Sequence, residues 1–133
     1  MRLMTMAAGL LAAGSFLMAA TPDEAALRSA MKQIGPTCSG LGKKIAAKDA
    51  TSTADAKQLQ QWFGDVQKFW KAKGAEDGVT HSKTARAEFK AISKLAGGGK
   101  WDEAGASFKK ATATCKGCHD AHREKGADGW KVK

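Results

Sequence analysis

The sequence predicts an all-α protein, an antiparallel four-helix bundle. Apolar residues recur at steps of three and four, which is the period of an amphipathic helix. Beyond residue 20 the chain has no run of Val and Ile and no long alternation with period two. Glycine-rich breaks divide it into four such segments, and amphipathic helices joined by short links are typical of a bundle.

The first helix is expected over residues 22–48. Thr21 suits a helix cap and Pro22 suits the first turn. Pro36 follows Gly35 inside this segment and is expected to kink or divide the helix, because proline removes a backbone hydrogen bond. One apolar seam follows the segment: Leu27, Met31, Ile34, Cys38, Leu41 and Ile45.

The other three helices are expected over residues 53–73, 83–96 and 101–125. Glycines and polar residues predict a loop over 74–82 and an unstructured tail over 126–133. The second helix carries a wide aromatic face that is expected to pack in the core or against a cofactor: Trp62, Phe63, Phe69 and Trp70.

Residues 1–20 have the pattern of a secretory signal peptide. Arg2 is followed by an apolar run that is rich in Ala and Gly and ends in the small residues Ala19 and Ala20. Cleavage there leaves a mature domain of residues 21–133, exported to the periplasm without stable membrane insertion. An uncleaved membrane anchor is the alternative, because the run is nearly long enough to span a bilayer.

The charge balance of the chain is basic. The formal net charge is +9, and removal of Arg2 with the leader lowers it by one. A basic domain prefers anionic partners. Export argues against nucleic acid, so the expected partner is an acidic protein surface, although spread lysines also serve simply to keep a helical domain in solution.

Two of the three cysteines and two of the three histidines lie within eight residues, in "CKGCHDAH". On a helix, Cys115, Cys118 and His119 share one face, because they are three and four residues apart. A c-type haem needs this arrangement: two thioether bonds to the porphyrin and an adjacent histidine on the iron. We therefore expect one covalent haem c, with His119 as axial ligand.

Three other interpretations of the motif stay open. A thioredoxin-like dithiol needs its Cys-x-x-Cys after a strand and at a helix start, whereas this motif lies deep in a predicted helix. A zinc site needs four ligands around a tetrahedron, and Cys115, Cys118, His119 and His122 all lie along one short stretch. The third interpretation is that the motif occurs by chance and has no function.

The segments "KLAGGGKWDEAGASFKKATATCKGCHDAHREK" and "MKQIGPTCSGLGKKIAAKD" resemble the cytochrome c′ family, whose members are exported four-helix bundles with a haem motif near the end of the last helix. The resemblance is weak over residues 50–80. It matches Cys115, Cys118 and His119 one for one and places Arg123 at a basic position near the haem. His122 departs from the family, which often has an aromatic residue there. Relatives often pair through their first two helices, so a homodimer is one expectation.

Met31 is the candidate sixth ligand of the iron. It lies in the first helix, which packs near the last, and its thioether would give a low-spin haem of raised potential. Low-spin relatives have a methionine in a similar "MK" context, whereas high-spin relatives have a non-bonding residue near this position. A methionine that merely packs in the core is the alternative.

Four further residues have competing interpretations. Arg28 neutralises a haem propionate or is an ordinary solvated arginine. Cys38 is a small core residue or forms an intermolecular disulfide. His122 is expected to be a partly exposed polar residue by the haem edge, since it could bind iron only in another haem. His81 is expected in a solvated loop.

The function expected from these features is a periplasmic monohaem electron carrier with no catalytic residues of its own. The alternative within the same family is a five-coordinate haem protein that binds nitric oxide or carbon monoxide. A metal or dithiol protein without haem is the alternative from another class.

Overall fold

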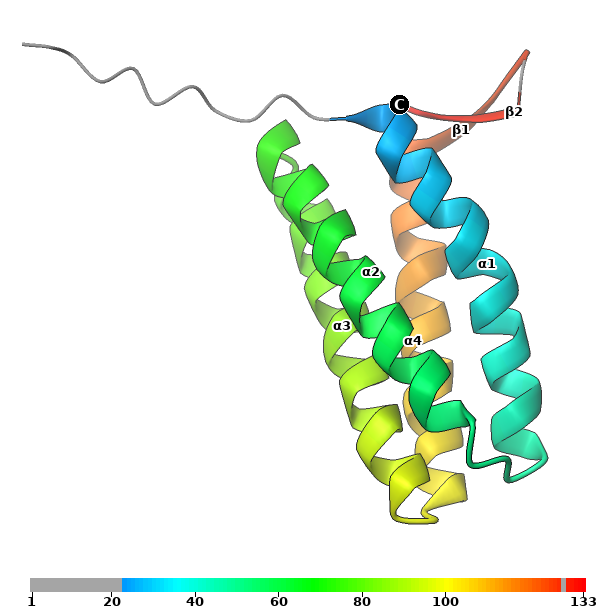
Figure 1. Ribbon diagram of the computed structural model, residues 1–133. Helices are drawn as coiled ribbons and strands as arrows, with labels where there is room; N and C mark the ends of the chain where they lie inside the picture. The colour runs from blue at the N-terminus through cyan, green and yellow to red at the C-terminus, as the bar shows by residue number, and fades with distance from the viewer. Residues whose placement is uncertain (1–22, 128) are drawn as a thin grey trace, which may run out of the picture.

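The computed structural model describes residues 23–127 and 129–133. The predicted signal peptide, residues 1–20, lies outside the described residues. Four antiparallel helices form an up-and-down bundle, which confirms the predicted all-α fold (Figure 1). The helices are α1 (Glu24–Ala46), α2 (Ser52–Lys73), α3 (Glu76–Gly97) and α4 (Trp101–His122). None of these helices is long and apolar enough to span a bilayer.

Helix α1 begins two residues later than predicted and is not divided by its proline. The Asp23 carboxylate accepts a hydrogen bond of 3.0 Å from the Ala26 backbone N–H and so caps the helix. Pro36 lies inside α1 on its exposed face. The carbonyl of Lys32, which loses its hydrogen bond to residue 36, lies on the same exposed face, where water can satisfy it. The helix therefore continues through the proline.

The predicted loop over residues 74–82 is wrong, because α3 already begins at Glu76. Gly74 adopts φ 75° and ends α2, and only Ala75 separates it from α3. Glu76 and Asp77 favour this start, since acidic side chains are stabilising at the positive end of a helix. Gly78 is helical and buried, with its Cα against the Trp70 ring. Packing overrides the weak helix propensity of glycine here.

The predicted tail is also wrong, because it forms half of a hairpin. Strands β1 (Arg123–Gly126) and β2 (Gly129–Val132) pair antiparallel, with Arg123 opposite Val132 and Lys125 opposite Trp130. Helix α4 accordingly ends at His122 instead of continuing to residue 125. The hairpin lies at the end of the bundle where α1 begins (Figure 1).

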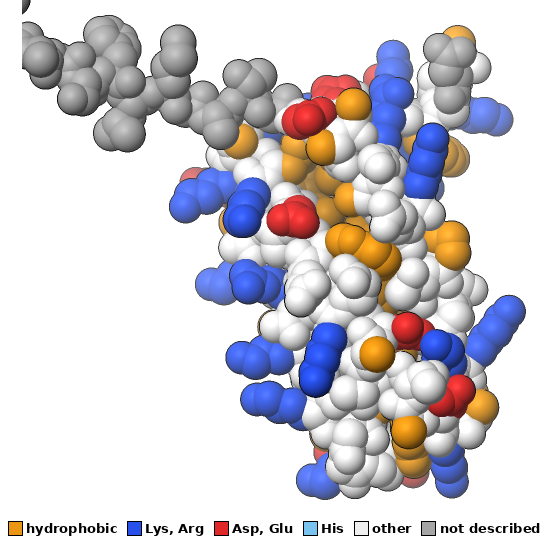
Figure 2. Space-filling view, in the orientation of Figure 1, with side chains coloured by type: hydrophobic (Ala, Val, Ile, Leu, Met, Phe, Trp, Pro, Cys, Tyr) orange, Lys and Arg blue, Asp and Glu red, His pale blue; other side chains and the backbone are white. Residues whose placement is uncertain are grey.

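Buried side chains extend along the whole bundle and include Leu27, Phe69 and Trp70 at the hairpin end. Large buried side chains such as Leu41, Leu59, Phe89 and Ile92 lie toward the end where α1 meets α2. At the hairpin end, α3 and α4 contribute small buried residues: Gly78, Ser82, Ala85, Ala111 and Cys118. In the view of Figure 2, apolar side chains are recessed in the upper half of the molecule, and basic side chains lie on both flanks.

Replacing Gly78 tests this packing. A Cβ at residue 78 would lie 2.5 Å from two atoms of the Trp70 ring, which is buried. We expect Gly78→Ala to lower the free energy of unfolding by about 1–3 kcal/mol, as overpacking does. The measurement is urea unfolding followed by circular dichroism.

Gly105→Ala is the matched control, because no atom lies within 4 Å of a Cβ built at residue 105 of α4. We expect this change to stabilise the protein by about 0.5–1 kcal/mol. Equal effects of the two substitutions would show that Gly78 is not packed as described.

Candidate functional site

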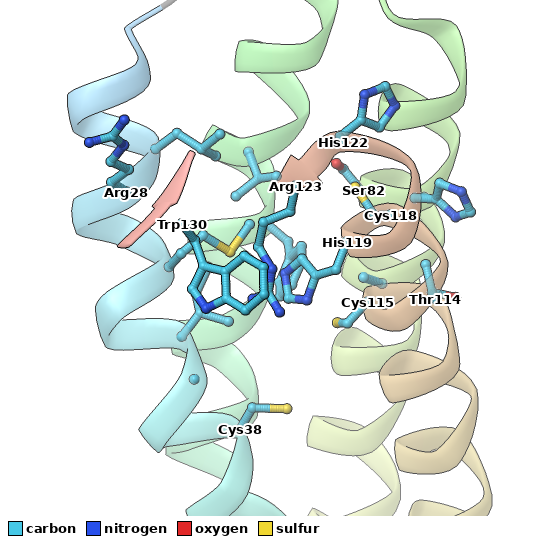
Figure 3. Close-up of a pocket in the computed structure, with 18 of the residues that line it drawn as sticks. Arg28, Cys38, Ser82, Thr114, Cys115, Cys118, His119, His122, Arg123 and Trp130 are labelled. Atoms are coloured by element: carbon cyan, nitrogen blue, oxygen red, sulfur yellow. The ribbon is translucent and has the colours of Figure 1, made fainter. Parts of the chain in front are cut away.

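A cavity of about 660 Å³ opens into the hairpin end of the bundle. Ligand and cofactor pockets typically measure about 300–1,000 Å³. All four helices and strand β2 contribute to its lining, and the apolar side chains of Phe63, Val66 and Trp70 supply the α2 wall. Figure 3 shows the cavity between α1 on one side and α4 on the other.

Helix α4 places the two motif cysteines and the histidine that follows them on the cavity wall. Cys115, Cys118 and His119 all line the cavity. Cys118 is buried, and Cys115 and His119 are half-buried. The predicted sharing of one helix face is therefore observed, and that face is turned toward open space instead of toward a neighbouring helix (Figure 3).

Burial changes the acid–base properties of this wall. Burial, with smaller contributions from Cys38 and Cys118, raises the pKa of Cys115 to about 12. Burial also raises the pKa of Cys118 to about 11, helped by Asp77. The pKa of His119 is lowered, first by burial and then by the nearby Arg123 cation. At neutral pH these groups are therefore two thiols and a neutral imidazole.

These properties weigh against two of the alternatives for the motif. Redox-active dithiols depend on a lowered cysteine pKa, whereas both pKa values are raised here. Within residues 23–127 and 129–133, no group of three or more His, Cys, Asp and Glu side chains is arranged to hold a metal ion. The motif thus lacks the converging ligands of a protein-only zinc site.

Helix α1 forms the opposite wall with three residues singled out in the sequence. Arg28, Met31 and Cys38 all line the cavity. Met31 is half-buried and packs against the cluster of buried side chains that forms the core of the bundle. Burial raises the pKa of Cys38, so this thiol is also protonated at neutral pH. Arg28 is exposed and lies at the mouth, where it also lines a smaller depression of about 250 Å³ next to the hairpin.

His81 lies inside α3 and not in a solvated loop, so that prediction is wrong. It is half-buried and lines the cavity. A Cβ at Gly117 would lie 3.1 Å from His81 Cε1, so the glycine of the Cys-Lys-Gly-Cys motif allows the imidazole to pack closely against α4. The spacing of His81 to Ala85 and Phe89 is four and eight residues, a helical signal that was present in the sequence.

His122 holds the end of α4 against the start of α3. Its Nε2 lies 2.6 Å from Asp77 Oδ2, and its ring centroid lies 4.4 Å from that of Trp70. The hydrogen bond from His122 lowers the pKa of Asp77. The side chain of His122 is 15% exposed and lines the cavity, so the residue is partly exposed as predicted.

Trp130 is the main residue of the site that the sequence interpretation missed. It lines the cavity from β2, and the Arg123 guanidinium carbon lies 4.1 Å from its ring centroid. Arg123 itself lines the cavity, whereas its position near a haem stays a prediction. Gly126, Asp128 and Gly129 are turn residues that could have predicted a hairpin here, although an Asp-Gly turn alone would predict another register than the observed pairing of Gly126 with Gly129.

Comparison with known proteins adds no family to this description. No protein-family model, curated protein or solved structure matches the chain. The fold defines an up-and-down four-helix bundle with a cavity at one end. The resemblance to the cytochrome c′ family therefore depends on the quoted sequence segments alone.

The reactivity of the motif cysteines provides a test of the site. With both thiols free, we expect Cys115 and Cys118 to react with iodoacetamide at least about 100-fold more slowly at pH 8 than an exposed cysteine, because so little thiolate is present. Since raised pKa values shift ionisation to higher pH, the rates should keep rising from pH 7 to 10 without levelling. Peptide mass spectrometry measures each rate.

Glutathione is the reference thiol in the same experiment, because its rate levels near the ordinary cysteine pKa. A plateau of either motif cysteine below pH 8 would contradict the burial described here and would favour the reactive dithiol.

Proposed function

We propose that this chain is a periplasmic monohaem c-type cytochrome that carries electrons. One haem would be bound covalently by Cys115 and Cys118, with His119 as the axial ligand of its iron. The observation that carries the proposal is the joint placement of both thiols and the imidazole on one wall of a single cavity.

The residues present fit a haem in three respects. The cavity has the size of a cofactor site and a wall of aromatic and aliphatic side chains, as a flat apolar ring system requires. The buried Trp70 Nε1–H, on the same wall, finds no acceptor among the described residues, so a polar group of a bound molecule could accept from it. Arg28 and Arg123 supply cations suited to carboxylate groups.

The protein residues would hold and tune the group. A bound haem supplies reversible one-electron chemistry at its iron. His119 offers a neutral imidazole at neutral pH, because burial and Arg123 lower its pKa. The apolar walls exclude water and the two arginines add positive charge, and both factors set the potential of such a site. No residue is assigned a catalytic role.

The sequence supports the proposed location and partner. In this proposal residues 1–20 act as a leader that directs the chain for export. The proposed c-type haem agrees with a location in the periplasm. The basic balance of the chain favours a redox partner with an acidic surface. Pairing of two copies through α1 and α2 stays a prediction from the resemblance.

The first test is covalent attachment. The purified mature protein should begin near Thr21, have the mass of the processed chain plus one haem, and keep its pigment in acid–acetone, because thioether bonds do not break there. Cys115→Ser with Cys118→Ser should abolish the covalent pigment. Intact mass and the visible spectrum are the measurements.

Cys38→Ser is the matched control, since Cys38 lines the same cavity but lies outside the motif. It should keep the haem. Covalent haem in the double variant, or none in the wild type, would contradict the proposal, and the second result would favour the class without haem.

Met31 decides between the electron carrier and the gas-binding alternative. It lies on the cavity wall opposite the motif, on α1, and is half-buried. If its sulfur binds iron, the wild type is six-coordinate and low-spin. Met31→Ala should then become high-spin and gain at least about tenfold in affinity for carbon monoxide, because the competing ligand is gone. Absorption spectroscopy and carbon monoxide titration measure both changes.

Met31→Leu is the control that keeps side-chain volume and removes the sulfur. Ligation predicts that it behaves like Met31→Ala, whereas simple packing predicts a wild-type spectrum. A wild type that is already five-coordinate and high-spin would show that Met31 is no ligand and would favour binding of nitric oxide or carbon monoxide as the function.

A further inference from the structure

The C-terminal hairpin contributes both of its faces to the cavity lining, since Gly129 and Lys131 line the cavity from the face opposite Trp130. Residues directly opposite each other in an antiparallel pair lie on the same face. Arg123 and Val132 therefore share a face with Lys125 and Trp130. Val132 packs against the core cluster, and Arg123, Trp130 and Val132 all line the cavity. This face of the hairpin consequently forms part of the cavity wall.

Trp130 lies at the boundary between the cavity and solvent. Its side chain is 53% exposed, and it is the one large hydrophobic residue classed as exposed in the described part of the chain. It lines both the main cavity and the small depression outside it, as Arg28, Gly129 and Lys131 also do. Figure 3 shows the indole between α1 and the side chains of Arg123 and His119.

One contact holds the indole itself, and two others hold the hairpin that carries it. The Arg123 guanidinium carbon lies 4.1 Å from its ring centroid, within the range of a cation–π contact. The Lys133 backbone N–H donates a 3.0 Å hydrogen bond to the His122 carbonyl at the end of α4. Lys131 Nζ lies 3.5 Å from Glu124 Oε1 across the two strands. Because the hairpin follows α4 directly, these contacts fix the indole relative to His119.

We propose that Trp130, positioned by Arg123, covers the mouth of the cavity and determines which external ligands enter the space between His119 and Met31. A partial cover of this kind admits a diatomic molecule more readily than a planar ring such as imidazole. The ligand-selection part rests on the proposed haem function, whereas the cover itself does not.

The cover is tested first without haem, through the chain's own thiols. Cys115 and Cys118 line the cavity, so their rates of reaction with N-ethylmaleimide report access to it. In the full chain with free thiols, Trp130→Ala should raise both rates at constant pH by at least about fivefold. Arg123→Lys keeps the charge but loses the planar stacking, and should raise them about two- to fivefold, as expected for one exposed cation–π contact.

Lys125→Ala is the matched control, because Lys125 pairs with Trp130 in the strand register but does not line the cavity. In Lys125→Ala both cysteines should react with N-ethylmaleimide at the wild-type rates. Urea unfolding of each variant separates opening of the mouth from global unfolding, and Trp130 lies outside the buried core, so its loss leaves the bundle folded. Rates in Trp130→Ala that stay within twofold of the wild type overturn the cover.

The second arm uses the haem-loaded protein in a Met31→Ala background, so that Met31 cannot compete for the iron. Adding Trp130→Ala should speed imidazole association at least about fivefold and carbon monoxide association less than about twofold, because the opened mouth matters most for the larger ligand. Equal acceleration of both ligands, or of neither, overturns the ligand selection. A protein that takes up no haem refutes the proposed function, while the thiol rates still decide the cover.

Discussion

The small side chains on the inner faces of α3 and α4 are the constraint on which the site depends. Toward the hairpin end these helices bury small residues: Gly78, Ser82, Ala85, Ala111 and Cys118. Bundle cores are otherwise packed to high density, as they are around Phe89 and Leu41. Along α3 the buried residues change from Phe89 and Ile92 to the small residues Gly78 and Ser82 toward the hairpin end, where the cavity opens. The motif face of α4 borders this cavity.

Most of the fold could be predicted from the sequence, because the helical spacing of apolar residues follows from the burial of one face of each helix. Leu27, Ile34, Leu41 and Ile45 of the first seam are buried as expected. The errors arose where local signals and packing disagree. Gly78 resembles a loop residue, yet it is helical because only a glycine fits beneath Trp70. Pro36 resembles a break, yet it is tolerated because the carbonyl that it leaves unpaired faces solvent.

The candidate site could be predicted only where it follows helical spacing. Cys115, Cys118 and His119 share a face through their sequence separation, and Met31 and Cys38 follow the seam of α1 to the same cavity. The approach of His81 to Gly117, the pairing of His122 with Asp77 and the stacking of Arg123 on Trp130 join separate elements. Contacts of that kind depend on how the helices and the hairpin are placed, and single-sequence patterns carry little information about that.

The two principal walls of the cavity belong to opposite ends of the chain. Helix α1 packs on α2 and less extensively on α4, whereas α2, α3 and α4 pack closely in succession. Joining the first helix to the last closes a loop that contains the other two, and the entropic cost of closure grows with the logarithm of loop length. The α1–α4 wall is thus the least local contact of the bundle and the last to gain from folding. A rigid molecule wider than the mouth would therefore have to displace α1, the helix that packs least extensively against the others.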